Sequence, residues 1–513
     1  MAAGSEDALA GWLLRINRMA GVNPSYRQAT RFIADFPGGC WQAGADSYKV
    51  SRWETGAIRV PYLAVRRYEE LLRLESNQLV SVIDAVNRYL APSIVAMPRL
   101  ERRVVVEQPA DHERLAVIVD RVYGDDPVSG DSWDSLSAFL ASNPGTVILR
   151  SNGVWSAIAE RLLAELVIAT GRAWTQRYEA FSRLLAHPIA QAAAVDACAQ
   201  LGRDPTNQVF IDTLSVLDAS PHPAAGHELV RQIANAVNDR ARYGALLGSE
   251  RKLRLGHFAP ADRAVLERLL RDLATSTTCG DAHGDFARHL LQQVQPDRTS
   301  AAHNLDQAPA ADAVVARLVL KLAGDERLGE AATRDALLPT LLHEGLYSPS
   351  ADTQLYAALL LRASPYRHPL ARAVGNELRA SRLTATVGTA IALVNLFCLV
   401  GGPADGSVLI ELLTRRDVPL SVKEAAALRI GHVVQGAPGS AIGTLLDFYL
   451  AQWQRQRASS VATIIGDLGY SIGVAGDEQA LHRLAAAEAP AESRRAARWY
   501  RDIPRAVRIS AQT

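Results

Sequence analysis

The sequence has little cysteine, with only Cys40, Cys198, Cys279 and Cys398 among 513 residues. No two of them stand in a Cys-x-x-Cys pair, the spacing typical of zinc sites and redox motifs. The scatter argues against a disulfide framework and fits a reducing cytoplasm. The first residues, which include Glu6 and Asp7, lack the apolar core of a secretion signal. We therefore expect a cytoplasmic protein.

The chain also lacks an excess of either charge. Its 55 lysines and arginines face 54 aspartates and glutamates, which gives a net charge of +1. This balance excludes a protein whose whole body binds polyanions, but it leaves room for a local basic patch. Nearly all of the basic residues are arginines, a bias that we attribute to a GC-rich bacterial genome rather than to mechanism; the lysines are Lys49, Lys252, Lys321 and Lys423.

Catalytic motifs are missing as well. The sequence contains no HExxH zinc motif, no GxSxG nucleophile elbow, no phosphate-binding GxxxxGKS/T loop and no GxGxxG after a strand. His283, Asp285 and His289 lie near Cys279, but their spacing matches no standard helical pair of metal ligands. We expect no enzyme, no metal site and no cofactor.

Long apolar runs are rare, and one needs an explanation. Residues 383–404 carry no charge and are long enough to cross a bilayer. The run contains Thr384, Thr386 and Asn395, and it ends in glycine and proline. We interpret it as a buried helix of a large helical body and expect no membrane contact.

Helical periodicity is what the sequence has in abundance. Val80, Ile83, Val86 and Leu90 form one stripe of a helix, and the same pattern recurs along most of the chain. Hydrophobic residues make up 48% of the sequence, as in a folded globular protein. The best strand candidate, residues 103–107, is short and isolated. The sequence therefore predicts an all-α fold.

Proline recurs at the expected starts of helices. His187-Pro188, His222-Pro223 and His368-Pro369 each precede a helical run, and the first two pairs are 35 residues apart. A period of about 35 to 40 residues built from helix pairs is typical of a solenoid, and this region resembles degenerate HEAT or armadillo-type repeats. Polar breaks at 124–130 and 295–312 suggest loops. We predict a helical connecting region over 77–165 and two helical-repeat lobes over 166–295 and 296–513.

The N-terminal segment 1–76 predicts a small domain of four helices. The first runs over 9–20 and the second over 25–36, followed by a glycine-rich stretch. The third begins near Asp46 or Ser47, both good helix caps, and stops at Gly56; the fourth begins at Pro61. We expect Val50 and Trp53 in its core.

This region resembles the XRE family of helix-turn-helix proteins, the Cro and lambda-repressor type. The resemblance rests on Val50-Ser51-Arg52-Trp53-Glu54-Thr55-Gly56, followed by Arg59, Pro61 and a leucine-patterned helix. It covers about one eighth of the chain. One departure is the stretch between the second and third helices, which is longer than the usual tight turn. In accord with the resemblance, residues 8–68 hold nine basic and three acidic side chains, a local excess that attracts DNA phosphates.

The resemblance implies a set of DNA contacts. The third helix would enter the major groove with Ser47, Tyr48, Lys49 and Arg52 facing the bases. Phosphate contacts would come from Ser25, Tyr26, Arg27 and Arg59. For Glu54 we expect a capping role or a pair with an arginine of the first helix rather than a DNA contact. For Cys40 and Trp41 we expect packing of the loop onto the domain. For Arg66 and Arg67 the sequence does not decide between contact with DNA and a place on a solvated face.

Together these patterns favour a sequence-specific transcriptional regulator that binds double-stranded DNA. The segment 1–76 offers little apolar surface for self-association, so we expect a homodimer formed through the helical body. That body also offers a surface for a peptide, protein or small-molecule effector. The alternative is a protein-interaction scaffold in which the helix-turn-helix is a docking module.

Overall fold

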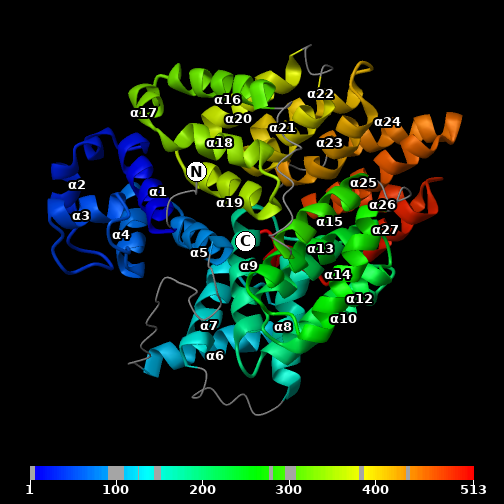
Figure 1. Cartoon of the computed structure of the whole chain (residues 1–513), viewed down its shortest axis with the longest axis horizontal. Helices are drawn as coiled ribbons and strands as arrows, with labels where there is room; N and C mark the ends of the chain where they lie inside the picture. The colour runs from blue at the N-terminus through cyan, green and yellow to red at the C-terminus, as the bar shows by residue number, and fades with distance from the viewer. Residues whose placement is uncertain are drawn as a thin grey trace. The chain divides into compact units, whose positions relative to one another are not determined.

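The computed structural model describes residues 6–90, 109–124, 126–143, 152–275, 281–294, 308–380, 386–434 and 440–513. Every regular element in these ranges is a helix, which confirms the predicted all-α fold (Figure 1). The strand predicted over 103–107 lies outside the described residues. By contacts the chain divides into two compact units, Met1–Leu90 and Arg99–Glu101 with Asn304–Asp502, and Ala91–Pro98 and Arg102–His303 with Ile503–Thr513. This grouping does not test the predicted domain boundaries, which stay predictions.

The first unit begins with a small helical module, residues 6–90. Its elements are α1 (Glu6–Ala20), the 3-10 helix η1 (Pro24–Arg27), α2 (Ala29–Asp35), α3 (Ser47–Glu54), α4 (Tyr62–Leu72) and α5 (Gln78–Leu90). The single second helix predicted over 25–36 is wrong, because the chain is extended at Gln28 and divides it into η1 and α2. The Asn23 side chain caps η1 by accepting from the Ser25 N–H. The helices expected from Asp46 and from Pro61 are present.

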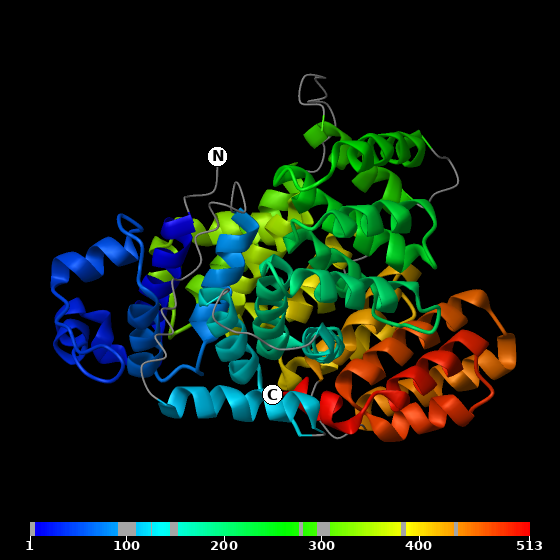
Figure 2. The same cartoon turned by 90° about the horizontal axis from the view of Figure 1, so that it is seen from below.

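The rest of the first unit is a two-row array of helices. In one row α19, α21, α23, α25 and α27 each pack on the next, and α20 packs on α22 and α24 on α26 in the other. Helix α5 of the module packs on α19 of this array. Figure 2 shows the blue helices of the module beside the yellow-green helices of the array. The bounds are α16 (Ala308–Ala323), α17 (Gly329–Arg334), α18 (Leu337–Tyr347), α19 (Ala351–Ala363), α20 (Arg367–Arg379), α21 (Val387–Val400), η5 (Pro403–Asp405), α22 (Ser407–Thr414), α23 (Leu420–Val433), α24 (Ser440–Gln456), α25 (Ser459–Ala475), α26 (Glu478–Ala486) and α27 (Ala491–Asp502).

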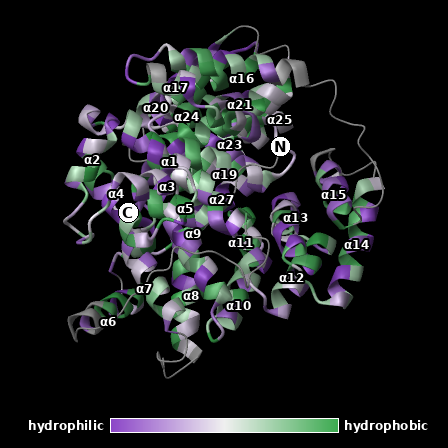
Figure 3. Ribbon diagram, turned by 60° about the vertical axis from the view of Figure 1, so that its left-hand side comes forward, coloured by the Kyte–Doolittle hydropathy of each residue, from purple (hydrophilic) through white to green (hydrophobic). Residues whose placement is uncertain are grey.

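The uncharged run at 383–404 contributes α21. Leu393, Val394 and Phe397 of this helix are buried against its neighbours, as predicted for a core helix. Figure 3 shows the helices around α16, α21 and α24 mainly in the hydrophobic colour. Among the described residues, no helix combines the length and the apolar character needed to cross a membrane.

The second unit is also built from packed helices, in which α8 packs on α10, α10 on α12 and α11 on α13. Ser129 caps α7, so the predicted break before Gly130 is confirmed. The loop predicted over 295–312 is too long, because α16 already begins at Ala308; residues 295–307 lie outside the described residues. The bounds are α6 (Pro109–Tyr123), α7 (Gly130–Ser142), α8 (Asn152–Leu166), α9 (Gly171–Ala186), α10 (Gln191–Arg203), α11 (Phe210–Ser215), η3 (Val216–Ala219), α12 (Pro223–Ala234), α13 (Asp239–Arg254), α14 (Pro260–Thr275), α15 (Asp281–Val294) and α28 (Arg505–Ser510).

Candidate nucleic-acid interface

Helix α3 has one buried and one exposed face. The Asp46 carboxylate caps it by accepting from the Lys49 N–H at 2.7 Å. Val50 and Trp53 are each 1% exposed, which confirms their predicted place in the core. The Trp53 ring lies 5.8 Å from that of Phe36 and 5.7 Å from that of Trp41. This aromatic packing fixes which side of α3 faces solvent.

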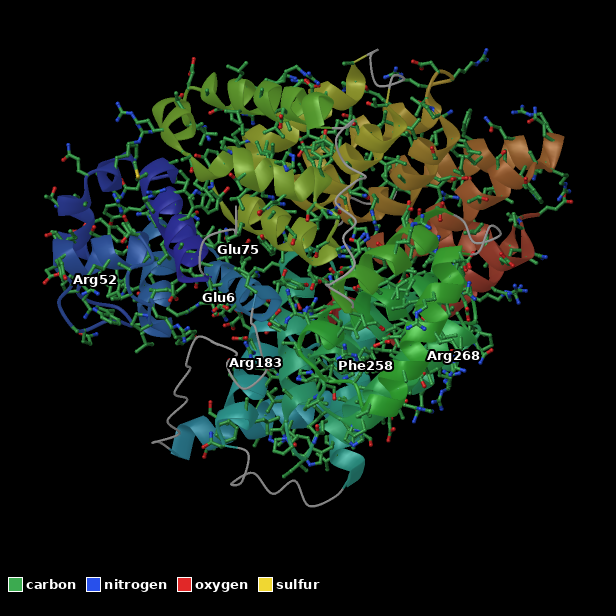
Figure 4. The ribbon with its side chains drawn as sticks, viewed as in Figure 1. Glu6, Arg52, Glu75, Arg183, Phe258 and Arg268 are labelled. Atoms are coloured by element: carbon green, nitrogen blue, oxygen red, sulfur yellow. The ribbon has the colours of Figure 1, made fainter. Side chains whose placement is uncertain are left out.

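The exposed side of α3 carries Ser47, Tyr48 and Ser51, with Tyr48 68% exposed. Arg52 lies one turn after Tyr48, and its Nη1 donates to the Tyr48 hydroxyl at 3.2 Å. Its guanidinium also lies 5.3 Å from the centre of the Tyr48 ring. Figure 4 shows Arg52 at the outer edge of the module, away from its core. The face therefore offers hydroxyl groups and a guanidinium, which can form hydrogen bonds with base edges.

Lys49 is held differently from Arg52. Its Nζ lies 5.2 Å from the centre of the Trp41 ring and 5.4 Å from that of Trp53, so it rests over the aromatic core. Within the part of the chain that the structure describes, neither Lys49 nor Arg52 forms an ion pair. Both cations thus keep their charge available for an anionic partner.

A buried ion pair joins α3 to α1. The Arg18 guanidinium donates to both carboxylate oxygens of Glu54, at 2.6 and 2.7 Å, and to the carbonyl of Tyr26 at 2.8 Å. The Tyr68 hydroxyl of α4 donates to Glu54 at 3.0 Å. Burial, followed by the Glu54 charge, raises the pKa of Tyr68 well above its ordinary value. The predicted partner of Glu54, an arginine of the first helix, is confirmed, and the pair links α1, η1, α3 and α4.

The long connection between α2 and α3 is held against the module. Gly38 and Trp41 exchange backbone hydrogen bonds of 2.7 and 2.9 Å, and the Trp41 ring packs 6.0 Å from that of Phe36. Trp41 therefore packs the loop onto the domain, as predicted. Burial and the neighbouring Glu70 raise the pKa of the Cys40 thiol to about 11, so this cysteine is not a thiolate at neutral pH.

Arg66 and Arg67, which the sequence left open, bind within the module. Arg67 donates to the carbonyls of Asp35 and Phe36, each at 2.7 Å, and pairs with Glu70 at 2.9 Å. Arg66 pairs with Glu69 at 2.8 Å. Neither is an unattached surface charge.

The residues predicted to contact phosphates lie in different environments. Ser25 is exposed, and its hydroxyl donates to Asn23 at 2.7 Å. Tyr26 is 7% exposed, and its hydroxyl donates to Asp35 at 3.2 Å, so a phosphate contact requires this bond to open. Arg27 is exposed and donates to the Arg327 carbonyl at 3.2 Å. Arg59, 54% exposed, pairs with Asp7 at 3.5 Å.

The local positive charge is smaller than the sequence window suggested. Three of the basic residues in 8–68 pair with carboxylates just outside it, Asp7, Glu69 and Glu70. Over residues 6–90 there are eleven basic and nine acidic side chains, a net charge of +2. Positive charge is therefore concentrated at a few positions rather than spread over the module.

Sequence reasoning missed how the module is attached to the helical array. The Trp12 Nε1–H lies 2.9 and 3.1 Å from the two carboxylate oxygens of Asp335, and the Tyr366 hydroxyl donates to Asp335 at 3.0 Å. Asn17 donates to the Ala363 carbonyl at 3.1 Å. An asparagine on the apolar side of α1 was the available signal, because a buried amide needs a hydrogen-bond partner.

Among the described residues, no group of three or more His, Cys, Asp or Glu side chains is arranged to hold a metal ion. Of the set considered from the sequence, His283 contacts the Asp239 carbonyl and His289 contacts Glu250, while Cys279 lies outside the described residues.

Comparison with known proteins found no protein family, no curated protein and no solved structure that matches this chain. The resemblance of the N-terminal segment to XRE-type proteins therefore stays a prediction from the sequence.

Proposed function

We propose that the protein is a sequence-specific regulator that binds double-stranded DNA through α3. The observation that carries this proposal is the exposed face of α3, where Tyr48 and Arg52 stand clear of the core. A guanidinium at the solvent face of a short, rigidly packed helix suits guanine O6 and N7 in the major groove. The phosphate contacts come from Arg27, Arg59 and the hydroxyl of Ser25.

The remainder of the chain dimerises and senses a signal in this proposal. The two rows of helices in the first unit are the packing expected of HEAT or armadillo-like repeats, which support this part of the proposal. A single recognition helix reads too few base pairs for selectivity in a genome, so the working form is a homodimer on an inverted repeat. Light scattering of the full-length protein tests this, and a monomer bound to DNA would contradict it.

Selection of bound fragments from genomic DNA tests the main proposal. We expect a defined site, and Arg52→Ala should weaken binding to it by about 1 to 3 kcal/mol. Arg455→Ala is the matched control, because Arg455 is exposed on α24 and forms no ion pair within the described part of the chain. Arg59→Ala should weaken binding to all sequences alike and reduce the salt dependence. Normal binding by Arg52→Ala would remove α3 from the recognition role.

The nearly balanced charge of residues 6–90 favours a second candidate, in which α3 docks onto a protein. The two functions differ in their response to salt. The affinity for DNA bound through several phosphates falls steeply as the salt concentration rises. A module that docks onto a protein is not retained on DNA even at low salt.

A further inference from the structure

A cavity of about 1030 Å³ lies inside the first unit, where the module meets the helical array. Its module side is formed by the end of α1, by η1 and by the segment after α4. Its other side is formed by the turn after α16 and by the start of α20. The volume is just above the usual range for small-molecule sites, about 300 to 1,000 Å³.

The cavity wall is rich in cations. Five arginines and a histidine line it, against two carboxylates, Asp325 and Glu326; the arginines are Arg27, Arg327, Arg362, Arg367 and Arg372, and the histidine is His368. One of the carboxylates is already used, because Arg372 pairs with Asp325 at 2.7 Å. Burial, and then the charge of Arg367, lower the pKa of His368, as expected where positive charge accumulates.

Two of these cations are exposed at the rim. Arg327 is exposed, and its side chain forms no ion pair within the described residues. Among the described residues, the Arg27 side chain donates to the carbonyl of Arg327, a neutral acceptor that a charged ligand can replace. Arg367, by contrast, is anchored deeper by hydrogen bonds to the carbonyls of Val400 and Gly401.

The same wall has an apolar part. Leu72, Leu74, Leu328, Pro24 and Pro365 line the cavity together with the cations. Such a mixture suits a molecule with an anionic group at one end and an apolar body at the other. A free inorganic anion would leave this apolar surface uncovered.

We propose that this cavity binds a small organic anion, a carboxylate or phosphate carried on an apolar body, and that this ligand weakens DNA binding. The regulatory part rests on the function proposed above. Arg27 belongs to both surfaces, since it lines the cavity and is a candidate phosphate contact. A ligand anion that pairs with Arg27 makes this charge unavailable for a DNA phosphate. By reciprocity, DNA that contacts Arg27 lowers the affinity of the cavity for the ligand.

Two fluorescent probes test the cavity without DNA. The anion 8-anilinonaphthalene-1-sulfonate should bind the full-length protein at one site per chain, and its neutral relative N-phenyl-1-naphthylamine should bind at least tenfold more weakly. Arg327→Ala should reduce sulfonate affinity about tenfold, the loss of one charged hydrogen bond. Arg455→Ala, outside the cavity, should change nothing, and thermal unfolding should show that both variants are folded. Equal binding of the two probes, or an unchanged affinity in Arg327→Ala, would overturn the site.

DNA coupling is measured separately. A saturating concentration of the sulfonate should lower the affinity of the full-length protein for its selected DNA at least fivefold, and by less in Arg327→Ala. Unchanged DNA affinity with the sulfonate bound would overturn the regulatory role while the cavity site stands. A protein that binds no DNA would refute the proposed function instead, and the probe titrations would still decide the cavity.

Discussion

Glu54 shows at the scale of one residue how the module is held together. Its side chain is 6% exposed, and its two oxygens accept from Arg18 and Tyr68. Three helices, α1, α3 and α4, meet at this carboxylate, and Arg18 extends the link to η1 through the Tyr26 carbonyl. Charges are expensive to bury unless every hydrogen-bonding group finds a partner, and here the partners come from different elements. The pair therefore fixes the position of α3 rather than adding a surface attraction.

Replacing Glu54 with glutamine should strongly destabilise the module. Arg18 would remain buried without its counter-charge, a loss of about 3 to 5 kcal/mol. Urea unfolding followed by tryptophan fluorescence measures the change. Arg31→Gln is the matched control, because Arg31 pairs with Asp35 at 3.1 Å while 63% exposed, and such pairs contribute at most about 1 kcal/mol. Equal losses from the two substitutions would show that burial of the Arg18–Glu54 pair has no special cost.

A second carboxylate should make the first unit sensitive to acid. Burial of Glu377 on α20 acts to raise its pKa, but hydrogen bonds from Lys321 at 2.8 Å and Arg317 at 3.0 Å outweigh burial and hold the pKa at about 2. Because this pKa is below its ordinary 4.5, the ionised group stabilises the fold above pH 4.5, and this stabilisation is lost as pH falls from 4.5 towards 2.

Thermal unfolding across that pH range, compared between the natural chain and Glu377→Gln, checks the prediction. The variant should be less stable near neutral pH and lose less stability on acidification. The same pH dependence in both proteins would mean that another carboxylate is responsible.

At the scale of elements, the crossing of α1 and α3 depends on glycine. A methyl group on Gly11 would lie 2.5 Å from the Trp53 carbonyl oxygen, far inside contact distance. Gly56, just after α3, has a φ of +70° and also lies against the start of α1. The two helices can approach closely only because side chains are absent there.

Gly11→Ala should therefore push α1 and α3 apart and cost about 1 to 3 kcal/mol, although alanine is the better helix former. The control is Gly44→Ala, since an added methyl there meets no atom within 4 Å. Unfolding in urea compares the two. If Gly11→Ala is as stable as Gly44→Ala, the close approach of α1 and α3 does not depend on Gly11.

Local signals explain which elements could be predicted. Asp46, Gly56 and Pro61 mark the ends of α3 and the start of α4 within a few residues, so the sequence predicts these helices well. The break at Gln28 was missed, because Asn23 caps a turn that could equally begin a longer helix. The His222 side chain caps α12 by accepting the Ala224 N–H with Nδ1, and His187 accepts the Ala190 N–H just before α10; the prolines of the His-Pro pairs indicated neither hydrogen bond.

The candidate site was predictable in part for the same reason. The buried and exposed faces of α3 follow from helical spacing, and Val50, Trp53 and Tyr48 lie where that spacing places them. The ion pairs that reduce the positive charge of residues 8–68 involve Asp7, Glu69 and Glu70, which lie just outside that range. The cavity lies between segments about 300 residues apart in sequence, as the separation of Arg27 and Arg327 shows, and no local pattern encodes such a meeting.

At the scale of the whole chain, the N-terminal module belongs to the same compact unit as residues 304–502. Asp335 is central to this attachment, because it accepts from both Trp12 and Tyr366. Trp12 on α1 is buried against the helical array, so this apolar side chain is covered within the chain and is not a surface for self-association.

Asp335→Ala should loosen this attachment. It would leave two buried donors without an acceptor, at about 1 to 3 kcal/mol each, and hydrogen exchange should speed up along α1. Asp312→Ala is the control, because Asp312 is exposed on α16. Unchanged exchange in α1 would show that the module is held by other contacts.

The distance in sequence between Trp12 and Asp335 also has a consequence in time. The two residues are 323 positions apart, and a ribosome adds about 5 to 20 residues per second. A newly made α1 therefore waits about 15 to 65 s before its partner has been synthesised. Throughout that interval the indole of Trp12 has no place to be buried. The N-terminal module therefore completes its packing onto the helical array only after Asp335 has been synthesised.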